Sequence, residues 1–285
     1  MTSIPGKRRG LRTGAWAVAA VLLATIGARP AEAQVPTQLE NNQNIPLWPA
    51  GEVPLATGEA PLDVPFLTVF LPPEGQRTGA AVIVAPGGGN IMMMYGVEGF
   101  EVAERYNDWG VTAFVLTYRL QPYDNDARVL DAQRAVRLVR AHADEWGLDR
   151  ETLGFIGFSA GSNLGRSVVA SAGPGTPDAP DPIDRVSARP DYLVLVYGAG
   201  RATPEEDLST FPPTFLLSAA ADRGPSLGNA ELFAELVRAG ATAEIHVYQQ
   251  GRHGFGGGFG SREFSGWMPQ LRTFLEVGGF LPAGS

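Results

Sequence analysis

Cysteine is absent from all 285 residues of this chain. Disulfide bonds are therefore excluded, and so is a lipid anchor on an N-terminal cysteine. Without such staples the fold must be held by its hydrophobic core alone. The length suffices for this, because single α/β domains of roughly 200–250 residues are ordinary.

Positive charge is also scarce. The chain has 22 Lys and Arg against 30 Asp and Glu, for a net charge of −8, and its one lysine is Lys7. No run of basic residues occurs beyond the first dozen positions. A nucleic-acid groove and a surface for anionic membranes are thus disfavoured, and small or neutral ligands are favoured.

Long hydrophobic runs are missing as well. The longest, Ala15 to Ala28, has 14 residues, whereas a membrane-spanning helix needs about 20. Basic residues precede this run, and Ala31-Glu32-Ala33 follows it. The order basic, apolar, small is typical of a secretory signal peptide. We expect residues 1–33 to be removed after Ala33, leaving a secreted or periplasmic protein without a membrane anchor.

Apolar runs alternate with helical patterns along the rest of the chain, after a Pro/Gly/Asn-rich lead (residues 34–61) that predicts an irregular arm. The expected strands are Val64–Leu71, Ala80–Ala85, Val111–Tyr118, Thr152–Phe158, Tyr192–Tyr197, Thr214–Ala219 and Ala243–Tyr248. The expected helices are Phe100–Trp109, Arg128–Trp146, Asn163–Ser171, Leu227–Ala239 and Phe264–Val277. This alternation predicts one α/β domain over residues 62–285, with a mostly parallel sheet covered by helices on both faces.

The pattern G-x-S-x-G occurs twice, around Ser159 and around Ser226. A nucleophilic serine of this type needs a strand that enters a tight turn and leaves it as a helix. Ser159 has that context, between the strand ending at Phe158 and a helical segment. Ser226 follows non-strand residues and is flanked by Pro225, which is more typical of a helix N-cap. We therefore favour Ser159.

An acid and a base should follow the serine, in that order. Asp222 comes directly after a buried strand, at the sheet edge where ligand chemistry collects in α/β folds. The alternative for Asp222 is a turn or a cap of the next helix. Asp191 precedes its strand, and Asp207 lies in an acidic loop. We therefore favour Asp222 as the acid.

The chain has three histidines. His142 precedes the serine, and His246 lies within a strand, on a half-exposed face. His253 stands on the glycine-rich loop after the final strand, from which an imidazole can reach a serine. We therefore predict His253 as the base.

Three consecutive glycines, Gly87 to Gly89, follow the strand ending at Ala85. Backbone N–H groups free of side chains can approach a developing oxyanion, and the elbow geometry adds the N–H of Ala160. The alternative is a phosphate-binding turn. The segment has no Walker lysine and lacks the spacing of a dinucleotide fingerprint.

From about Trp48 to the C-terminus the chain resembles the bacterial α/β-hydrolases grouped with acetyl-xylan and other carbohydrate esterases, related to the hormone-sensitive-lipase-like carboxylesterases. The resemblance is carried by APGGGN, EGFEVAERYNDWGVTAFVLTYRL, DAQRAVRLVRAHADEWGLD, IGFSAGSNL, AEIHVYQQGRHGFG and the aspartate of AAADRG. It implies Ser159, His253 and Asp222 as the triad, with Gly88, Gly89 and Ala160 as oxyanion donors. The implied fold is that of an α/β-hydrolase.

Two departures from these relatives bear on the substrate rather than on the triad. Many relatives have an aromatic residue where Asn90 stands, and glycine and histidine where Ser162 and Asn163 stand. The inserts at 173–190 and 198–213 are short, so no large cap is expected over the site. The best candidates for an acyl-pocket wall form a cluster after the glycines: Asn90, Met92, Met93 and Tyr95, with Met94 between them.

These observations predict a secreted serine esterase that cleaves short acyl esters, above all acetyl esters on a carbohydrate such as acetylated xylan, without metal or cofactor. The substrate would be a small-molecule or polysaccharide ester. Alternatives within the fold are a peptidase of the prolyl-oligopeptidase type and a feruloyl-type esterase. An alternative of another class is an inactive hydrolase fold used as a binding module.

Overall fold

The computed structural model describes residues 1–2, 35–58, 63–198, 200 and 206–284. The signal peptide predicted for residues 1–33 lies, apart from its first two residues, outside the described residues. Among the helices that are described, none combines the length and the apolar character needed to cross a membrane.

One eight-stranded sheet forms the centre of the fold, in the order β1-β2-β4-β3-β5-β6-β7-β8. Its strands are β1 (Asn44–Pro46), β2 (Phe66–Phe70), β3 (Ala81–Ala85), β4 (Thr112–Thr117), β5 (Leu153–Phe158), β6 (Tyr192–Val196), β7 (Thr214–Ala219) and β8 (Ala243–Tyr248). The pairs β1–β2 and β2–β4 are antiparallel, and the other five are parallel. All seven predicted strands are confirmed, as is the mostly parallel sheet.

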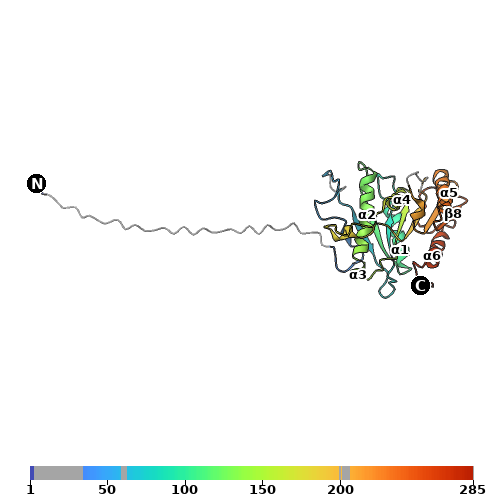
Figure 1. Cartoon of the computed structure of the whole chain (residues 1–285), viewed down its shortest axis with the longest axis horizontal. Coiled ribbons are helices and arrows are strands. Elements are labelled where there is room, and N and C mark those ends of the chain that lie inside the picture. Colours follow the sequence, from blue (N-terminus) through green and yellow to red (C-terminus); the bar gives the residue numbers. More distant parts are fainter. Residues whose placement is uncertain (3–34, 59–62, 199, 201–205, 285) are drawn as a thin grey trace. The chain divides into compact units, whose positions relative to one another are not determined.

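Helices cover both faces of this sheet, as predicted (Figure 1). The helices are α1 (Glu101–Asn107), α2 (Asn125–Ala141), α3 (Ala143–Trp146), α4 (Ala160–Ser171), α5 (Arg223–Arg238) and α6 (Trp267–Val277), preceded by a π-helical turn, η1 (Tyr95–Phe100). Buried residues of α2, α4 and α5 share one core with one face of the sheet. Those of α1 and α6 share a second core with the opposite face.

The central strands explain why both faces need covering. In β3, Ile83 lies in the first core, whereas Val82 and Val84 lie in the second. All five residues of β3 are buried. Because successive side chains of a strand point to opposite faces, an unbroken apolar strand requires a helix layer on each side.

Several helix starts differ from the prediction. The segment predicted as Arg128–Trp146 begins three residues earlier, because the Asp124 side chain caps the helix by accepting from the N–H of Ala127 at 3.1 Å. It then divides into α2 and α3. The prediction of Ser226 as an N-cap is wrong, because α5 starts at Arg223 and Asp222 holds the N-cap position. The helices α4 and α5 also begin earlier than predicted. Glycine is unfavourable inside helices, so the glycines in their first turns were interpreted as loop residues.

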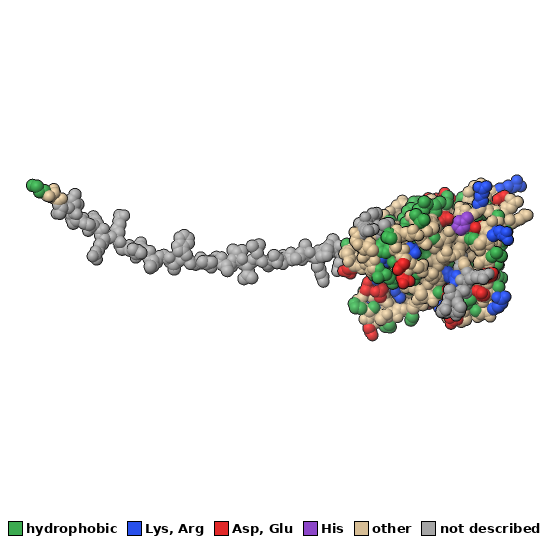
Figure 2. Space-filling model, turned by 90° about the horizontal axis from the view of Figure 1, so that it is seen from above, with side chains coloured by type: hydrophobic (Ala, Val, Ile, Leu, Met, Phe, Trp, Pro, Cys, Tyr) green, Lys and Arg blue, Asp and Glu red, His purple; other side chains and the backbone are tan. Residues whose placement is uncertain are grey.

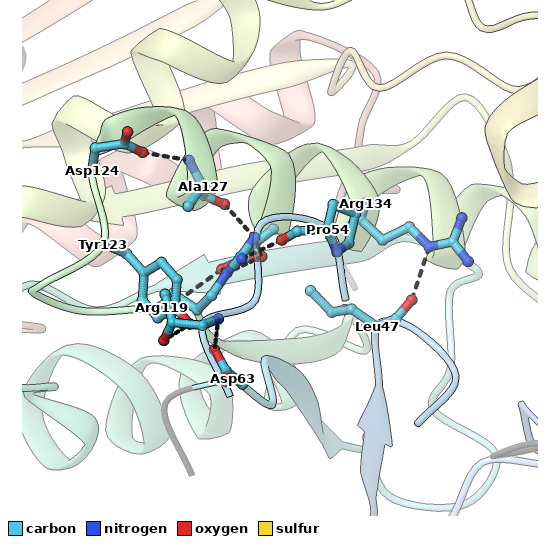
Figure 3. A network of polar contacts seen from close by, with 10 residues as sticks. Leu47, Pro54, Asp63, Arg119, Tyr123, Asp124, Ala127 and Arg134 are labelled. Atoms are coloured by element: carbon cyan, nitrogen blue, oxygen red, sulfur yellow. Dashed lines mark hydrogen bonds and ion pairs between the residues drawn. The ribbon is translucent and has the colours of Figure 1, made fainter. Parts of the chain in front are cut away.

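The segment predicted as an irregular arm contains the edge strand β1, whose Ile45 is 1% exposed. It is tied to the domain by buried arginines (Figure 3). Arg134 donates from Nε to the carbonyl of Leu47 at 2.8 Å, and Arg119 donates to the carbonyl of Pro54. Asp131 pairs with Arg119 at 2.7 Å. Residues 35–58 therefore pack with the domain that follows them.

The inserts after α4 and β6 are short, in agreement with the expected lack of a large cap. Between α4 and β6 the structure has one 3-10 turn, η2 (Pro182–Arg185). The described part of the next connection has another, η3 (Leu208–Thr210). Neither contributes a helical layer above the carboxyl edge of the sheet.

Candidate active site

Ser159 occupies a tight turn between β5 and α4. Its φ of 50° and ψ of −113° fall in a region that non-glycine residues rarely adopt. A Cβ on Gly157 would lie 2.1 Å from the carbonyl oxygen of Gly161, and one on Gly161 would lie 2.1 Å from that of Ala85. Both glycines are therefore needed for α4 to approach the sheet, and the serine is left at the carboxyl edge of β5.

The structure brings the three predicted triad residues into one hydrogen-bonded chain. Ser159 Oγ lies 2.7 Å from His253 Nε2, and His253 Nδ1 lies 2.6 Å from Asp222 Oδ2. Serine and histidine are 94 residues apart, and histidine and aspartate 31. The aspartate side chain is 15% exposed and the histidine side chain 46%. This arrangement can move a proton from a hydroxyl to an imidazole held by a carboxylate.

Asp222 stands at the N-cap position of α5, yet its side chain makes no capping hydrogen bond. The carboxylate is hydrogen-bonded to His253 instead. Its contacts are therefore those of a triad acid and not those of a helix cap. The competing aspartates are engaged elsewhere. Asp191 accepts from Arg140 Nη2 and from the N–H of Leu153, at the amino edge of the sheet. Asp207 accepts from the N–H and the hydroxyl of Ser209.

The other two histidines also have local partners. His142 Nδ1 lies 2.9 Å from the carbonyl oxygen of Leu138, and its ring stacks on Trp146. His246 Nε2 lies 2.6 Å from Glu244 Oε1, and its ring stacks on Phe215. Neither is part of the chain that contains the serine.

The three predicted oxyanion donors keep their backbone N–H groups free of protein acceptors among the described residues. In the described part of the chain, the N–H groups of Gly88, Gly89 and Ala160 donate to no protein acceptor. The N–H of Gly87 donates to Glu98 Oε2 at 2.7 Å, which removes it from the set of available donors. A Cβ on Gly88 would lie 2.1 Å from the carbonyl oxygen of Met92, so only glycine fits this position.

The predicted pocket residues divide into two groups. Met93 and Tyr95 line a hollow of about 280 Å³ between the start of β2 and the end of β4. Met92 is 57% exposed and lies outside this hollow. Asn90 also lies outside it, with a φ of 60° and a carbonyl that accepts from the N–H of Gln121.

Sequence reasoning missed two buried residues beside the triad, Glu98 and Tyr197. Glu98 accepts from the hydroxyl of Tyr197 at 2.8 Å. The ring of Tyr197 lies 4.9 Å from the ring of His253. The only local signal was an acidic residue within the stretch GVEGF, and nothing near it in the sequence indicated its partners. Within the described residues, no group of three His, Cys, Asp or Glu side chains could hold a metal ion.

Comparison with known proteins places this site in a family. A sequence model of the BD-FAE family matches residues 67–173, which include Ser159 and the glycine loop. An acetyl ester-xyloside bifunctional hydrolase of Caldicellulosiruptor lactoaceticus superposes with a TM-score of 0.78 at 31% identity, over 85% of this chain and 98% of that one. The chain belongs to the BD-FAE family of α/β-hydrolases. Asp222 and His253 lie beyond the part matched by the BD-FAE model.

Curated relatives of this BD-FAE family member are longer proteins. An acetylxylan esterase of Xylanibacter ruminicola is 26% identical over 242 residues, which cover 74% of this chain and 48% of that protein. An endo-1,4-beta-xylanase B of Butyrivibrio fibrisolvens is 29% identical over 241 residues, which cover 72% and 36%. The chain thus spans about half and about a third of the lengths of these two relatives.

Proposed function

We propose that this BD-FAE family member is a serine esterase. The observation that carries the proposal is the unbroken hydrogen-bonded chain Ser159–His253–Asp222, with contacts of 2.7 and 2.6 Å. A binding module has no need for these three groups in register at the carboxyl edge of the sheet. The esterase and hydrolase relatives support the same class of chemistry.

The proposed reaction follows from this geometry. His253 Nε2 takes the hydroxyl proton of Ser159, and Oγ attacks the ester carbonyl carbon. The N–H groups of Gly88, Gly89 and Ala160 then stabilise the negative charge on the former carbonyl oxygen. His253 returns the proton to the leaving alcohol, and a water molecule, activated by the same imidazole, hydrolyses the acyl-enzyme. Asp222 orients the imidazole and stabilises its charged form.

A fluorophosphonate probe, which labels activated serines, separates enzyme from module. We expect stoichiometric labelling of the folded protein, located at Ser159 by peptide mass spectrometry, and no labelling of Ser159→Ala. The matched control is Ser226→Ala, which should be labelled like the wild type. A folded wild-type protein that resists the probe would support the binding module.

For the substrate, we propose short acyl groups, above all acetyl, on a carbohydrate alcohol. No helix among the described residues covers the site, and the side chains beside the glycine loop are open to solvent: Ile91, Met92 and Met94 are 68%, 57% and 39% exposed. Figure 2 shows one face of the domain, on which hydrophobic side chains are exposed among polar and charged ones. The names of the relatives, an acetylxylan esterase and an acetyl ester-xyloside hydrolase, support this substrate class.

Acyl-chain preference tests the first half of the substrate proposal. Each added methylene gains at most about 0.8 kcal/mol, and only in a pocket that buries it. We expect kcat/KM for p-nitrophenyl acetate to exceed that for the octanoate, with the butyrate between them. A maximum at octanoate would refute the open-site proposal.

Release of acetate from acetylated xylan or its oligosaccharides tests the second half. The control polymer is the same xylan after chemical deacetylation. Turnover of p-nitrophenyl acetate without acetate release from either the polymer or its oligosaccharides would reject xylan while retaining the esterase.

We also propose that the protein is exported, on the strength of the basic, apolar and small-residue order of residues 1–33. N-terminal mass spectrometry of protein from an expressing bacterium should find a chain that starts at Gln34. An intact N-terminus on protein in the cytosolic fraction would reject export.

A further inference from the structure

Glu98 is a buried carboxylate for which the proposed mechanism has no use. It lies in η1 and is 2% exposed. Both of its oxygens accept hydrogen bonds: Oε2 from the N–H of Gly87 at 2.7 Å, and Oε1 from the hydroxyl of Tyr197 at 2.8 Å. Burying a carboxylate away from water costs free energy unless hydrogen bonds satisfy it. The two bonds offset that cost, and the presence of a charged group at this buried position points to a role for it.

The hydrogen bonds of Glu98 lead to the two loops that serve the triad, one directly through Gly87 and the other through Tyr197, which follows β6. Gly87 begins the glycine loop, directly before Gly88 and Gly89. Tyr197 links Glu98 to the histidine loop, because its hydroxyl also accepts from the N–H of Gly256 at 3.0 Å. Gly256 lies three residues after His253. One continuous hydrogen-bonded path therefore runs from the oxyanion loop to the histidine loop.

A second set of contacts joins the same two regions through the backbone. The N–H of Gly257 donates to the carbonyl of Val97, the neighbour of Glu98, at 3.2 Å. A Cβ on Gly256 would lie 2.3 Å from that same carbonyl oxygen. The histidine loop thus packs directly on η1, and π-helical turns such as η1 occur frequently at functional sites.

We propose that Glu98 is a positioning residue that holds the oxyanion loop and the histidine loop in one fixed relation to Ser159. This rests on the proposed esterase function. The site requires a carboxylate because two donors, an N–H and an O–H, point at the side chain. A glutamine would offer one oxygen acceptor and would turn its own NH₂ donor towards one of them.

Kinetics of Glu98→Gln and Tyr197→Phe test the proposal. Each change should lower kcat for p-nitrophenyl acetate about 10- to 100-fold and leave KM within about threefold, because a displaced oxyanion donor weakens the transition state more than the bound substrate. The double variant should be little worse than the more damaging single variant, because both act through one path. The control Asp131→Asn changes a different buried carboxylate and should retain the wild-type kcat per folded molecule.

Amide hydrogen exchange gives a readout independent of activity. Tyr197→Phe leaves Glu98, the acceptor of Gly87, in place and removes one hydroxyl, which donates to Glu98 and accepts from the N–H of Gly256. If the loops are coupled, the amides of both Gly87 and Gly256 exchange faster in this variant, whether or not Glu98→Gln folds. Faster exchange at Gly256 alone would overturn the proposal, as would a folded Glu98→Gln with kcat within twofold of the wild type. A wild-type protein without esterase activity would reject the proposed function, and exchange would then still decide the coupling.

Discussion

Ser159 and Ser226 are flanked by glycines at the same spacing, but they differ in backbone conformation. Ser159 is held at a positive φ between a buried strand and a helix, with an imidazole nitrogen 2.7 Å from its hydroxyl oxygen. Ser226 lies inside the first turns of α5. The local pattern is therefore necessary for the turn, and the strand before it decides whether a nucleophile forms.

The two serines give the most direct prediction. Ser159→Ala should lower ester hydrolysis by about 10⁴-fold or more, because loss of a triad nucleophile removes the covalent route. Ser226→Ala should keep activity within about twofold of the wild type. Initial rates with p-nitrophenyl acetate measure both, with circular dichroism to verify folding. An inactive Ser226→Ala beside an active Ser159→Ala would reverse the assignment.

The aspartates permit a matched comparison. Asp222→Asn should lower kcat by about 10³- to 10⁴-fold, because an amide in this position favours the wrong imidazole tautomer. Asp207→Asn should leave kcat unchanged, since among the described residues that carboxylate accepts from Ser209 alone. Steady-state kinetics of the two purified variants provide the measurement. Full activity in Asp222→Asn would mean that another group orients the base.

The pH dependence of the rate tests the base. Only a neutral imidazole can accept the serine proton, because a protonated imidazole has no free lone pair on Nε2. We expect kcat/KM to fall as the pH is lowered from about 8 to 5 and to recover on return to pH 8. Tryptophan fluorescence across the range checks that the protein stays folded. A flat profile would exclude a histidine as the general base.

At the scale of elements, the elbow depends on how closely α4 approaches the sheet. Gly161 sits in the first turn of α4, where a side chain would meet the carbonyl oxygens of Ala85 and Pro86 at 2.1 and 2.8 Å. Both are backbone atoms of the segment that leads into the glycine loop. A change at this helix start is therefore transmitted to the oxyanion donors.

Gly161→Ala should lower the free energy of unfolding by about 1–3 kcal/mol or more, because backbone must move to admit the methyl group. Gly173→Ala is the matched control. A Cβ there would meet no atom within 4 Å, and its φ is not positive. It should be neutral or stabilise by about 0.4–1 kcal/mol through reduced freedom of the unfolded chain. Urea unfolding followed by fluorescence compares them, and equal stabilities would contradict the packing argument.

At the scale of the whole molecule, the pair Arg119–Asp131 fastens the N-terminal segment to the domain (Figure 3). Burial raises the pKa of Asp131 to about 6, and the hydrogen bonds and charge of Arg119 oppose that rise. The folded state therefore binds the Asp131 proton at a higher pH than the unfolded state does. The stability linked to that proton is complete below about pH 4 and is lost as the pH rises through about 6.

Arg119→Met should deepen this dependence, because it leaves the carboxylate buried without its cation. We expect a loss of about 3–5 kcal/mol in the free energy of unfolding at pH 8, where Asp131 must ionise. A smaller loss is expected at pH 5, where it stays protonated. Urea unfolding at the two pH values measures the difference. A loss equal at both would show that only the hydrogen bonds of Arg119 to the backbone matter.

The sequence by itself was sufficient to locate strands β2 to β8 along the chain and to single out the residues that the structure brings together in the candidate site. Apolar runs of five or more residues carry the strand signal within themselves, so all seven predicted strands were found. Ser159 and His253 were selected by local context and by a short list of alternatives. Such features are readable because their cause lies within a few residues. The three-residue strand β1 was missed, since so short a segment shows no periodicity and its partner β2 lies about twenty residues further along the chain.

Tertiary structure decided what distant residues do together. Asp222 occupies the N-cap position of α5, but its carboxylate is hydrogen-bonded to His253, 31 residues further along the chain, and not to the helix. Glu98 meets Tyr197 across 99 residues, and Tyr197 meets Gly256 across 59. A hydrogen bond between side chains from separate elements leaves no periodicity in the sequence, because it depends on how the elements pack and not on which residues are neighbours in the chain.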